Sequence, residues 1–529
     1  MNLGCGIDYL AGFVNVDARD GIGADLVHDI TKPFPYPDNS VSDIIAKDII
    51  EHLTLIQQQD LFKELYRLLI PGGKLWLRTP DLDDIWYRFE TDPDTRNLFL
   101  YGDTSEMETW GAHKSGHTLL SLATLAGSHG FILKKHVTIN TNLELEFTKG
   151  NLPILKGVIF INQSLGLGGA EQFNQQLLSW LMSRGVPIRA FVYNSDFKSL
   201  LQSKNIPAQK IPLVVDLIGD WKGFLKGIFI FPLAVVYYFY LVLKNKNSGT
   251  FLLTSYLEKI IITPFAKLFG QPVVWIEFGP LESIFSKFYF FPGFLYRLVS
   301  QLPDYVIEPS KHTFNHNISQ AGFSHARTKI IPCAISDLTI PSLPKISQSV
   351  YSVSRLEQGK GQDLLIAAWP EVLVKYPKAH LFFIGEGDFS KVLQKQVNDL
   401  NITSSVTFLG RVDDVAGTIS PYSVGVFPSV WPLEGFGLVV LEAMAAGKPI
   451  VCSNLGPYSE VADSQSAIFV DPRDKIQLTK SIISLLANPK LSRKLSQNAR
   501  KRFASLFIWD KIGPKYQSIL TLAQVRSSI

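Results

Sequence analysis

Cysteine is scarce in this chain of 529 residues, which contains only Cys5, Cys333 and Cys452, far apart in the sequence. No CxxC pair occurs, and the spacing gives no disulfide framework. Such usage is typical of a reducing compartment, so we expect a cytoplasmic protein. The N-terminus also lacks a basic segment followed by an apolar stretch, so we expect no secretory signal peptide.

A large net charge is missing as well. The formal charge is +4, and the basic residues are spread along the chain rather than gathered in one block. This pattern argues against nucleic acid as the main partner. The apolar fraction of 46% and the charged fraction of 19% are those of a well-cored globular protein. A chain of this length has room for about three to four domains.

No apolar run is long enough to be a clear membrane span. The longest uncharged stretch, residues 227–243, has 17 residues, contains Pro232 and is flanked by lysines. A span needs about 20 apolar residues. Three interpretations remain open: a buried helix, a surface that enters the membrane interface, or a true span. The aromatic stretch at 284–299, which carries Lys287 and Arg297, belongs with the same question.

Strand and helix signals divide the chain into three pieces, and in each of them strands alternate with helices, which predicts a parallel sheet. Composition shifts mark linkers at 148–156 and 341–348. The predicted domains are therefore 1–150, 157–340 and 349–529, and a helical tail at 507–523 is expected to pack back on the middle domain.

One string in the third piece carries most of the chemical information. Residues 434–451 read EGFGLVVLEAMAAGKPIV. Glycines at 435 and 437 allow a tight turn, a helix is predicted from Leu438, and Gly447 ends it. The unpaired amides at such a helix start bind anions and suit a diphosphate. Glu434 and Glu442 lie beside this turn, where carboxylates can accept hydrogen bonds from sugar hydroxyls.

This string resembles the donor-binding motif of family 4 retaining glycosyltransferases, which have the GT-B fold of two Rossmann-like domains. The strings SRLEQGKG, FFIGEGD and VTFLGRV extend the resemblance through the third piece. It implies that Arg355 and Lys360 bind the donor diphosphate, Glu434 the hexose and Glu442 the ribose. By the same resemblance, a UDP- or GDP-linked donor would also meet Glu386, the amides of Phe436, Gly437 and Leu438, and Gly168 and Gly169 of the GLGGAE loop.

A metal-binding DxD motif is absent from the sequence. The GT-B resemblance implies the same, because helix amides and basic side chains take over the work of a cation. We therefore expect no metal requirement.

The acceptor side departs from the family pattern. Many relatives have a histidine directly after the glutamate that matches Glu277, whereas this chain has Phe278. Three explanations stay open: a different acceptor geometry, Glu277 acting in place of the histidine, or a weak enzyme. Glu277 is the candidate acceptor-side residue.

The N-terminal piece resembles class I S-adenosylmethionine-dependent methyltransferases. The resemblance rests on LGCG at 3–6, NVD at 15–17, EHL at 51–53 and a PGG turn at 71–73. It implies that Gly4, Cys5 and Gly6 line the S-adenosylmethionine site, that Asp17 binds the ribose, and that Asp29 contacts adenine. His52, His113 and His117 are candidate bases on the methyl-acceptor side.

This piece also departs from its family. Asn2 stands where an acid is common, and Asp8 where a third glycine is usual. The stretch from Gly6 to Asp17 is too short for a crossover helix. Two alternatives remain open: an active methyltransferase, or a docking module without catalysis.

Together the motifs predict a bifunctional enzyme of a surface-polysaccharide or lipid-linked glycan pathway. One half would transfer a hexose from a nucleotide-sugar to a glycan or lipid-linked acceptor, with retention of configuration. The other would methylate an oxygen in the same pathway, at a membrane face if residues 227–243 form an interfacial surface. The alternatives are a glycosyltransferase with a docking domain and a non-catalytic glycan-binding scaffold.

Overall fold

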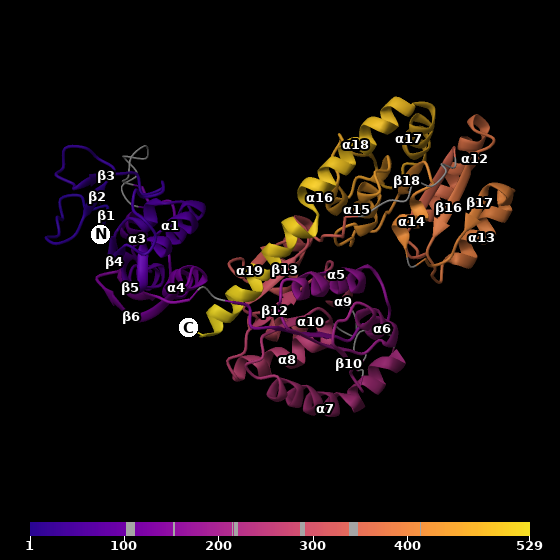
Figure 1. The fold of residues 1–529 in the computed structure, drawn as a ribbon. Coiled ribbons are helices and arrows are strands. Elements are labelled where there is room, and N and C mark those ends of the chain that lie inside the picture. The colour runs from indigo at the N-terminus through magenta and orange to yellow at the C-terminus, as the bar shows by residue number, and fades with distance from the viewer. Residues whose placement is uncertain are drawn as a thin grey trace. The chain divides into compact units, whose positions relative to one another are not determined.

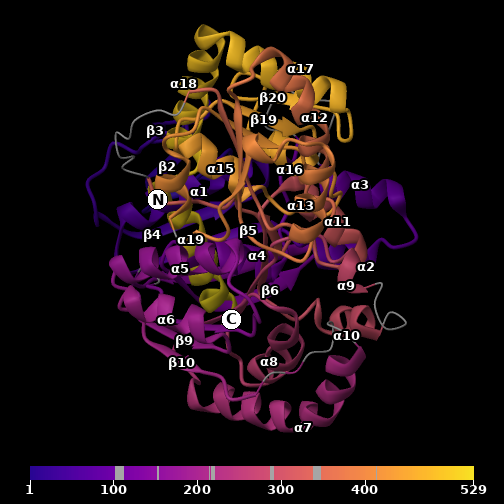
Figure 2. The same ribbon diagram turned by 90° about the vertical axis from the view of Figure 1, so that its right-hand side faces the viewer.

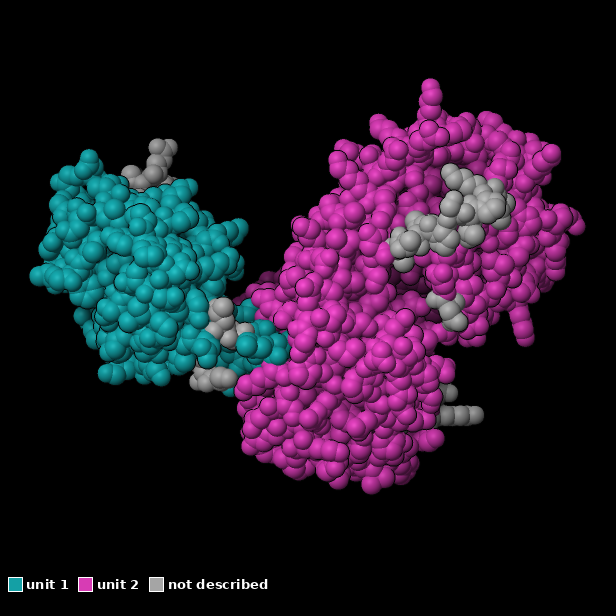
Figure 3. All heavy atoms as spheres, viewed as in Figure 1, with its two compact units in different colours: residues 1–155, 521–529 teal, residues 156–520 magenta. Residues whose placement is uncertain are grey.

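The computed structural model describes residues 1–101, 112–151, 154–213, 215, 221–285, 291–337, 347–412 and 414–528. It forms two compact units, coloured separately in Figure 3. Unit 1 comprises Met1–Leu155 and Thr521–Ile529, and unit 2 comprises Lys156–Leu520. Most of the linker predicted at 341–348, and parts of the stretches 148–156 and 284–299, lie outside the described residues.

Unit 1 is built on a sheet with the described strand order β3-β2-β1-β4-β5-β7-β6. The strands are β1 (Asn2–Leu3), β2 (Asn15–Asp17), β3 (Leu26–Val27), β4 (Val41–Lys47), β5 (Leu69–Pro80), β6 (Phe131–Ile139) and β7 (Asn142–Lys149). Strands β1 to β5 pair in parallel, as the alternation of strands and helices predicts.

Strand β7 runs antiparallel to β5, and β6 pairs antiparallel with β7, so only β7 runs against the direction of the other described strands of this sheet. The hairpin between β6 and β7 turns at Asn140 and Thr141, whose φ angles are 48° and 67°. Two consecutive residues with positive φ are the mark of a turn that matches strand twist in a tight hairpin. The departure from a parallel sheet therefore originates in a two-residue turn.

The helices described in unit 1 are α1 (Leu55–Leu68), α2 (Leu82–Arg88), α3 (Pro93–Tyr101) and α4 (Leu119–Ser128). Helix α1 starts with a capping box, in which the side chains of Thr54 and Gln57 each bond to the backbone of the other. Its apolar face joins the unit's core with Leu61, Phe62 and Leu65. Strands β1 and β2 pair in parallel although no helix is described between them.

Unit 2 contains two sheets in which all described strands are parallel. The first has the order β10-β9-β8-β11-β12-β13-β14. Its strands are β8 (Val158–Asn162), β9 (Ile188–Val192), β10 (Ala208–Lys210), β11 (Thr250–Leu253), β12 (Val273–Ile276), β13 (Tyr305–Glu308) and β14 (Thr328–Ile330). The central strands are buried along their whole length, because helices cover both faces of such a sheet.

The helices around this first sheet are α5 (Gly169–Ser183), α6 (Ser195–Ser203), α7 (Trp221–Lys244), α8 (Tyr256–Leu268), α9 (Glu282–Phe285), α10 (Phe291–Val299) and α11 (Lys311–Ala321). Figure 1 and Figure 2 both place α7 at the outside of this lobe, next to α8.

The second sheet of unit 2 has the order β17-β16-β15-β18-β19-β20 among the described strands. These are β15 (Ser349–Val353), β16 (His380–Ile384), β17 (Val406–Phe408), β18 (Val424–Phe427), β19 (Ile450–Ser453) and β20 (Ile468–Val470). The accompanying helices are α12 (Gln362–Lys375), α13 (Ser390–Asp399), α14 (Val415–Ile419), α15 (Leu438–Ala445), α16 (Gly456–Val461), α17 (Lys475–Ala487) and α18 (Pro489–Leu506).

The last helix, α19 (Trp509–Ser528), leaves the second lobe of unit 2 and packs on the first. The Trp509 indole donates to the Gln176 side chain at 3.0 Å, and the Tyr516 hydroxyl donates to the Ile331 carbonyl at 3.2 Å. Further along, the Thr250 hydroxyl donates to a carbonyl of α19 at 3.0 Å. Helix α19 therefore links the two lobes of unit 2, because it follows the second lobe in the chain and packs against the first.

Candidate active site

Each of the three sheets has one reversal of strand order between parallel neighbours, and a cavity lies at each of these reversals. The reversals fall between β1 and β4, between β8 and β11, and between β15 and β18. Neighbouring crossovers leave such a point in opposite directions, so the carboxyl ends of the two strands open a crevice. The cavities have volumes of about 420, 470 and 310 Å³ in chain order.

The smallest of these cavities surrounds Glu434. The carboxylate Oε1 of Glu434 accepts from the Lys360 ammonium at 2.6 Å, from the Ser429 hydroxyl at 3.0 Å and from the Tyr458 hydroxyl at 3.4 Å. Lys360 comes from the loop after β15, and Ser429 follows β18, so the reversal itself brings the two together. Sequence reasoning assigned Glu434 to a hexose and Lys360 to a diphosphate, and the structure couples them as an ion pair.

The other predicted donor residues divide into two groups. Arg355, Gly169, Phe436, Gly437 and Leu438 line this cavity together with Glu434. Arg355 is 72% exposed at its side chain and pairs with Glu357 at 2.7 Å, so it is accessible to a ligand. Glu386 is exposed and does not line the cavity, and neither Gly168 nor Glu442 is among its lining residues.

Glu442 lies in the second turn of α15, partly buried. Burial raises the pKa of its carboxyl to about 7. A carboxyl with this pKa exchanges its proton near neutral pH, and a hydroxyl donor would favour its ionised form.

The turn before α15 is set by a close approach between the two lobes of unit 2. A Cβ atom on Gly435 would lie 1.7 Å from the carbonyl oxygen of Phe278, which follows β12 in the other lobe. The Ser310 hydroxyl also donates to the Gly435 carbonyl at 2.9 Å. No side chain fits at position 435, so glycine is needed here for contact between the lobes.

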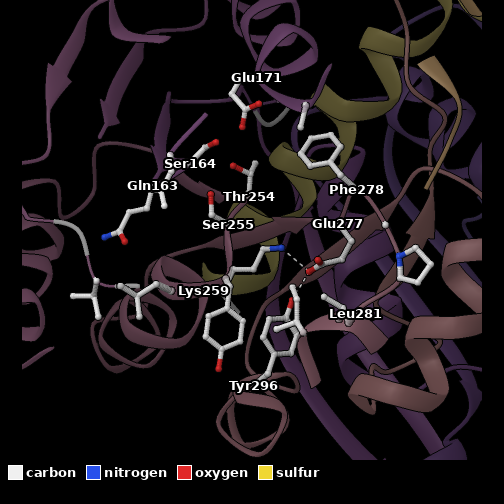
Figure 4. A pocket seen from close by; sticks show the side chains of 18 residues that line it. Gln163, Ser164, Glu171, Thr254, Ser255, Lys259, Glu277, Phe278, Leu281 and Tyr296 are labelled. Carbon is white, nitrogen blue, oxygen red and sulfur yellow. Dashed lines mark hydrogen bonds and ion pairs between the residues drawn. The ribbon is translucent and has the colours of Figure 1, made fainter. Parts of the chain in front are cut away.

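The cavity of the first lobe is the one seen in Figure 4. It is lined by the residues that follow β8, β11 and β12, among them Gln163, Thr254 and Glu277. Phe278 and Ala170 line both this cavity and the one around Glu434. The position where relatives have a histidine is therefore the wall between the two cavities, and an aromatic ring occupies it.

Glu277 is buried and tightly held, with its carboxylate facing Lys259 and Tyr296 in Figure 4. The Lys259 ammonium donates to Glu277 Oε1 at 2.6 Å and to the Ile276 carbonyl at 2.8 Å. The Tyr296 hydroxyl donates to the same carboxylate oxygen. The Lys259 side chain is 2% exposed and that of Glu277 is 5% exposed. The ion pair is therefore desolvated, and each charge depends on the other for its stabilisation.

A second carboxyl, that of Glu308, lies close to this pair. Burial, together with the charge of Glu277, raises the pKa of Glu308 to about 8. The Asn317 amide donates to Glu308 at 3.1 Å. With one ammonium and two carboxyls, the cluster is electrically neutral when Glu308 keeps its proton.

Gln163 lines this cavity with a side-chain amide that has no hydrogen-bond partner among the described residues. It is 6% exposed, and neither its side-chain oxygen nor its nitrogen has a hydrogen-bond partner. Leaving a buried amide without partners costs about 1–3 kcal/mol. Such a group is suited to a ligand that carries both a donor and an acceptor, as a hydroxyl does.

The cavity of unit 1 is lined by the LGCG loop and its neighbours, including Gly4, Cys5 and Gly6, with Asp48 and Arg78 on the opposite strands. A Cβ atom on Gly4 would lie 2.3 Å from the Ile49 side chain, and φ at this residue is 60°. The loop therefore requires glycine to pass so close to the end of β4.

Asp17 anchors this loop from the end of β2. It accepts from the Gly6 amide at 2.9 Å and from the Arg19 side chain at 3.0 Å. Burial opposes ionisation of Asp17, but the bonds from Arg19 and Gly6 outweigh it and lower the pKa. Asp29 is exposed and bonds to Thr31 at 2.8 Å, and neither Asp17 nor Asp29 is among the residues that line the cavity.

The three candidate histidines of unit 1 differ in their surroundings. His117 is buried, with its ring nitrogens 3.2 Å from the Ser121 hydroxyl and 3.0 Å from the Gln58 amide oxygen. Burial lowers the pKa of His117 to about 4, which favours a structural role over that of a base. His52 and His113 are half-buried, and their rings lie 5.2 Å apart.

Sequence reasoning did not find Lys259, Tyr296, Glu308 or Gln163, and on the donor side it passed over Ser429 and Tyr458. One signal was present, since Glu258 and Lys259 together interrupt the apolar positions of YLEKIII in α8. A lysine in such a run needs a buried anion, but its partner is 18 residues away and only the fold identifies it.

The stability of the folded protein should depend on pH through the proton that Glu308 carries. The folded protein holds this proton up to about pH 8, whereas an unfolded chain releases it at about pH 4. Stability therefore falls as pH rises between these values, by on the order of 5 kcal/mol from this group. Glu308→Gln should lose less melting temperature than wild type between pH 5 and pH 8, measured by differential scanning calorimetry. Equal losses in the two proteins would contradict the assignment.

Two parts of the chain match known protein families. Residues 340–502 match the family described as "Glycosyl transferases group 1", and residues 4–77 match the family described as "Methyltransferase domain". A GDP-mannose-dependent monoacylated alpha-(1-6)-phosphatidylinositol monomannoside mannosyltransferase of Corynebacterium glutamicum is 29% identical over 174 residues, 32% of this chain and 45% of the relative. A glycogen synthase of Mycobacterium tuberculosis is 34% identical over 163 residues, 30% of this chain and 39% of the relative.

Among solved structures, Anabaena HepE in complex with UDP-glucose covers 70% of this chain and 100% of its own, with a TM-score of 0.58 and 20% identity. At that identity the likeness shows the fold, which is GT-B in unit 2. The chain spans less than half the length of the two curated relatives named above. The protein thus carries a domain of the group 1 glycosyltransferase family at residues 340–502 and a methyltransferase domain at residues 4–77.

Proposed function

We propose that unit 2 is a retaining glycosyltransferase that takes a hexose from a UDP- or GDP-linked donor. The observation that carries the proposal is the cluster of Lys360, Ser429 and Tyr458 on the Glu434 carboxylate, next to the start of α15. One oxygen of Glu434 holds these partners, which leaves its other oxygen for sugar hydroxyls. The relatives point to the same donors, since one is named for GDP-mannose and HepE was solved with UDP-glucose.

The leaving diphosphate would be held by three kinds of group. The amides at the start of α15 point at the cavity and carry the positive end of the helix dipole. Arg355 lines the cavity and is exposed enough to turn from Glu357 to a phosphate. Lys360 is shared between Glu434 and the incoming phosphate, so the charge that develops on the leaving group meets a cation already in place. This scheme requires no metal.

The cavity of the first lobe is the proposed acceptor site. It adjoins the donor cavity at Phe278, and Glu277 and Gln163 supply polar contacts within a largely apolar lining. Lys259 and Tyr296 hold the Glu277 carboxylate, so it can accept from an acceptor hydroxyl without moving. An acceptor with both an apolar part and hydroxyl groups fits this lining, as a lipid-linked glycan does.

Peripheral attachment to a membrane forms part of the proposal. Within the described residues, one helix, Leu225–Lys244, is long and apolar enough to span a membrane by length and composition, and 28% of its most apolar stretch is buried. One face of this helix, which includes Ala234 and Tyr238, belongs to the core of the first lobe. Six exposed apolar residues of the helix recur every three or four positions and so form one stripe, with the exposed Ile228 beside it: Leu225, Phe229, Leu233, Val236, Tyr240 and Leu243.

This arrangement favours an interfacial helix over a span, because one face of α7 is part of a folded core. Lys226, Lys244 and Lys246 are exposed at the two ends of the stripe, where they can meet anionic headgroups. The proposed location is the inner face of the cell membrane. There the acceptor cavity would meet lipid-linked glycans.

Unit 1 would methylate an oxygen of the same glycan with S-adenosylmethionine. The support is the cavity at the end of β1 with the Gly6–Asp17 contact beneath it. Because Asp17 already bonds to the loop and to Arg19, a ribose would have to share or displace the Arg19 bond. A docking module without catalysis is the competing interpretation.

Substitutions in the two cavities of unit 2 should affect donor binding differently. Lys360→Gln should weaken binding of UDP-glucose or GDP-mannose about tenfold or more, because a charge-assisted contact is lost. Glu434→Gln should lower sugar transfer about 100-fold or more. Calorimetry and a transfer assay measure the two effects. Gln163→Ala, which lines only the acceptor cavity, is the matched control and should leave donor binding unchanged. Transfer by Glu434→Gln at the wild-type rate would support the scaffold interpretation instead.

Calorimetry with S-adenosylmethionine tests unit 1. Wild type should bind it, and Asp17→Ala should bind at least about tenfold more weakly, since the loop anchor and the ribose partner are both lost. Asp20→Ala removes an exposed carboxylate nearby and should bind as wild type does. Wild type that binds no S-adenosylmethionine would leave unit 1 as a docking module.

Vesicle flotation tests the stripe on α7. The double variant Phe229→Ser/Val236→Ser should float less with anionic phospholipid vesicles than wild type, because its exposed apolar area is smaller. Val374→Ser/Val392→Ser changes two exposed valines in the other lobe and should float like wild type. Equal flotation of all three proteins would remove α7 from the proposal.

A further inference from the structure

A cluster of three potential metal ligands lies in unit 1, beyond the end of β4. Glu51 and His52 belong to the short helical turn η1 (Ile50–His52), and His113 comes from the segment before α4. One ligand atom from each of the three lies within 4.8 Å of the others. The sequence separates His113 from the pair by 61 positions, so the fold and not the local sequence makes the cluster.

The ligands are oriented by neighbours, as metal ligands usually are. His52 Nδ1 lies 3.2 Å from the Ala112 carbonyl, which fixes the hydrogen there and directs the Nε2 lone pair away from that carbonyl. The Glu51 carboxylate accepts from the Thr79 hydroxyl at 3.1 Å through its Oε2 atom. The amides of Lys114 and Ser115 donate to the Glu51 carbonyl at 2.7 and 3.0 Å, which ties the His113 segment to η1.

The charge balance of the cluster also lacks a cation. Glu51 is 2% exposed, and within the described part of the chain no lysine or arginine forms an ion pair with it. A buried carboxylate is normally paired or bound to a metal. Arg78, the nearest candidate by strand order, pairs with Asp48 instead.

We propose that Glu51, His52 and His113 form a binding site for a divalent transition-metal ion. Two imidazoles and one carboxylate are a donor set that suits Zn²⁺ and related ions, and three protein ligands leave at least one position open. With bonds of about 2.1 Å, tetrahedral ligands lie about 3.4 Å apart, so the cluster contracts slightly on binding. The sequence-based prediction of no metal rests on the donor motif of unit 2, whereas this cluster lies in unit 1.

The position of the site suggests what the open coordination position meets. Lys47 and Asp48, which line the cavity of unit 1, lie four and three residues before Glu51, the first ligand in η1. The metal would therefore lie on the same edge of the sheet as that cavity, where an oxygen of a methyl acceptor could bind. Metal binding itself does not depend on methyl transfer, so the two can fail separately.

Titration of tag-free, chelator-treated full-length protein with ZnCl₂ tests the site. Wild type should bind one equivalent of Zn²⁺ with micromolar or tighter affinity. His113→Ala and Glu51→Gln should each weaken this binding about tenfold or more. Because Glu51 is buried, circular dichroism must show that its variant is folded, and His113→Ala supports the test independently as a half-buried residue.

Two controls make the result decisive. His136→Ala removes an exposed histidine of β6 and should leave the high-affinity equivalent intact. Co²⁺ in place of Zn²⁺ should give a spectrum without the thiolate band that Cys5 would contribute. Wild type that binds no stoichiometric Zn²⁺ would overturn the proposal, and so would full binding by a folded His113→Ala.

Discussion

The reversal of strand order in a parallel sheet is the constraint on which each site of this protein depends. Strands β1 and β4, β8 and β11, and β15 and β18 are neighbours whose following loops diverge. Loops that diverge leave the strand ends uncovered, so a cavity forms there without any side chain having to create it. The chemistry then depends on the few residues placed after those strands, such as Gln163, Thr254 and Ser429.

Two ion pairs give the cavities of unit 2 their electrostatic character, and they differ in burial. Lys259 and Glu277 are almost fully buried, so loss of either partner leaves an uncompensated charge in the core. Lys360 and Glu434 are 18% and 12% exposed at their side chains, so a ligand can reach and divide that pair. The first pair is suited to holding a fixed carboxylate, and the second to exchanging partners when a charged ligand binds.

The contact between the lobes of unit 2 places Phe278 at the wall between the two cavities. Phe278 lines both cavities, its carbonyl packs against Gly435, and its ring lies 5.7 Å from that of Phe173. An aromatic ring at this wall contributes shape and apolar surface, where a histidine would contribute a hydrogen bond. In the first-lobe cavity, Lys259 and Tyr296 hold the Glu277 carboxylate in place.

The sequence by itself determined the fold class, the pair of families and the local turn and helix start after Glu434, because these depend on short motifs whose members are close in the chain. Glycine turns, helix starts and strand ends are local, and EGFGLVVLEAMAAG or LGCG states them directly. Only the tertiary structure decided which charges meet. Lys360 and Glu434 are 74 positions apart, and His113 and Glu51 are 62 apart. Pairing across such distances follows from sheet order and burial, which a single sequence does not encode in any local pattern.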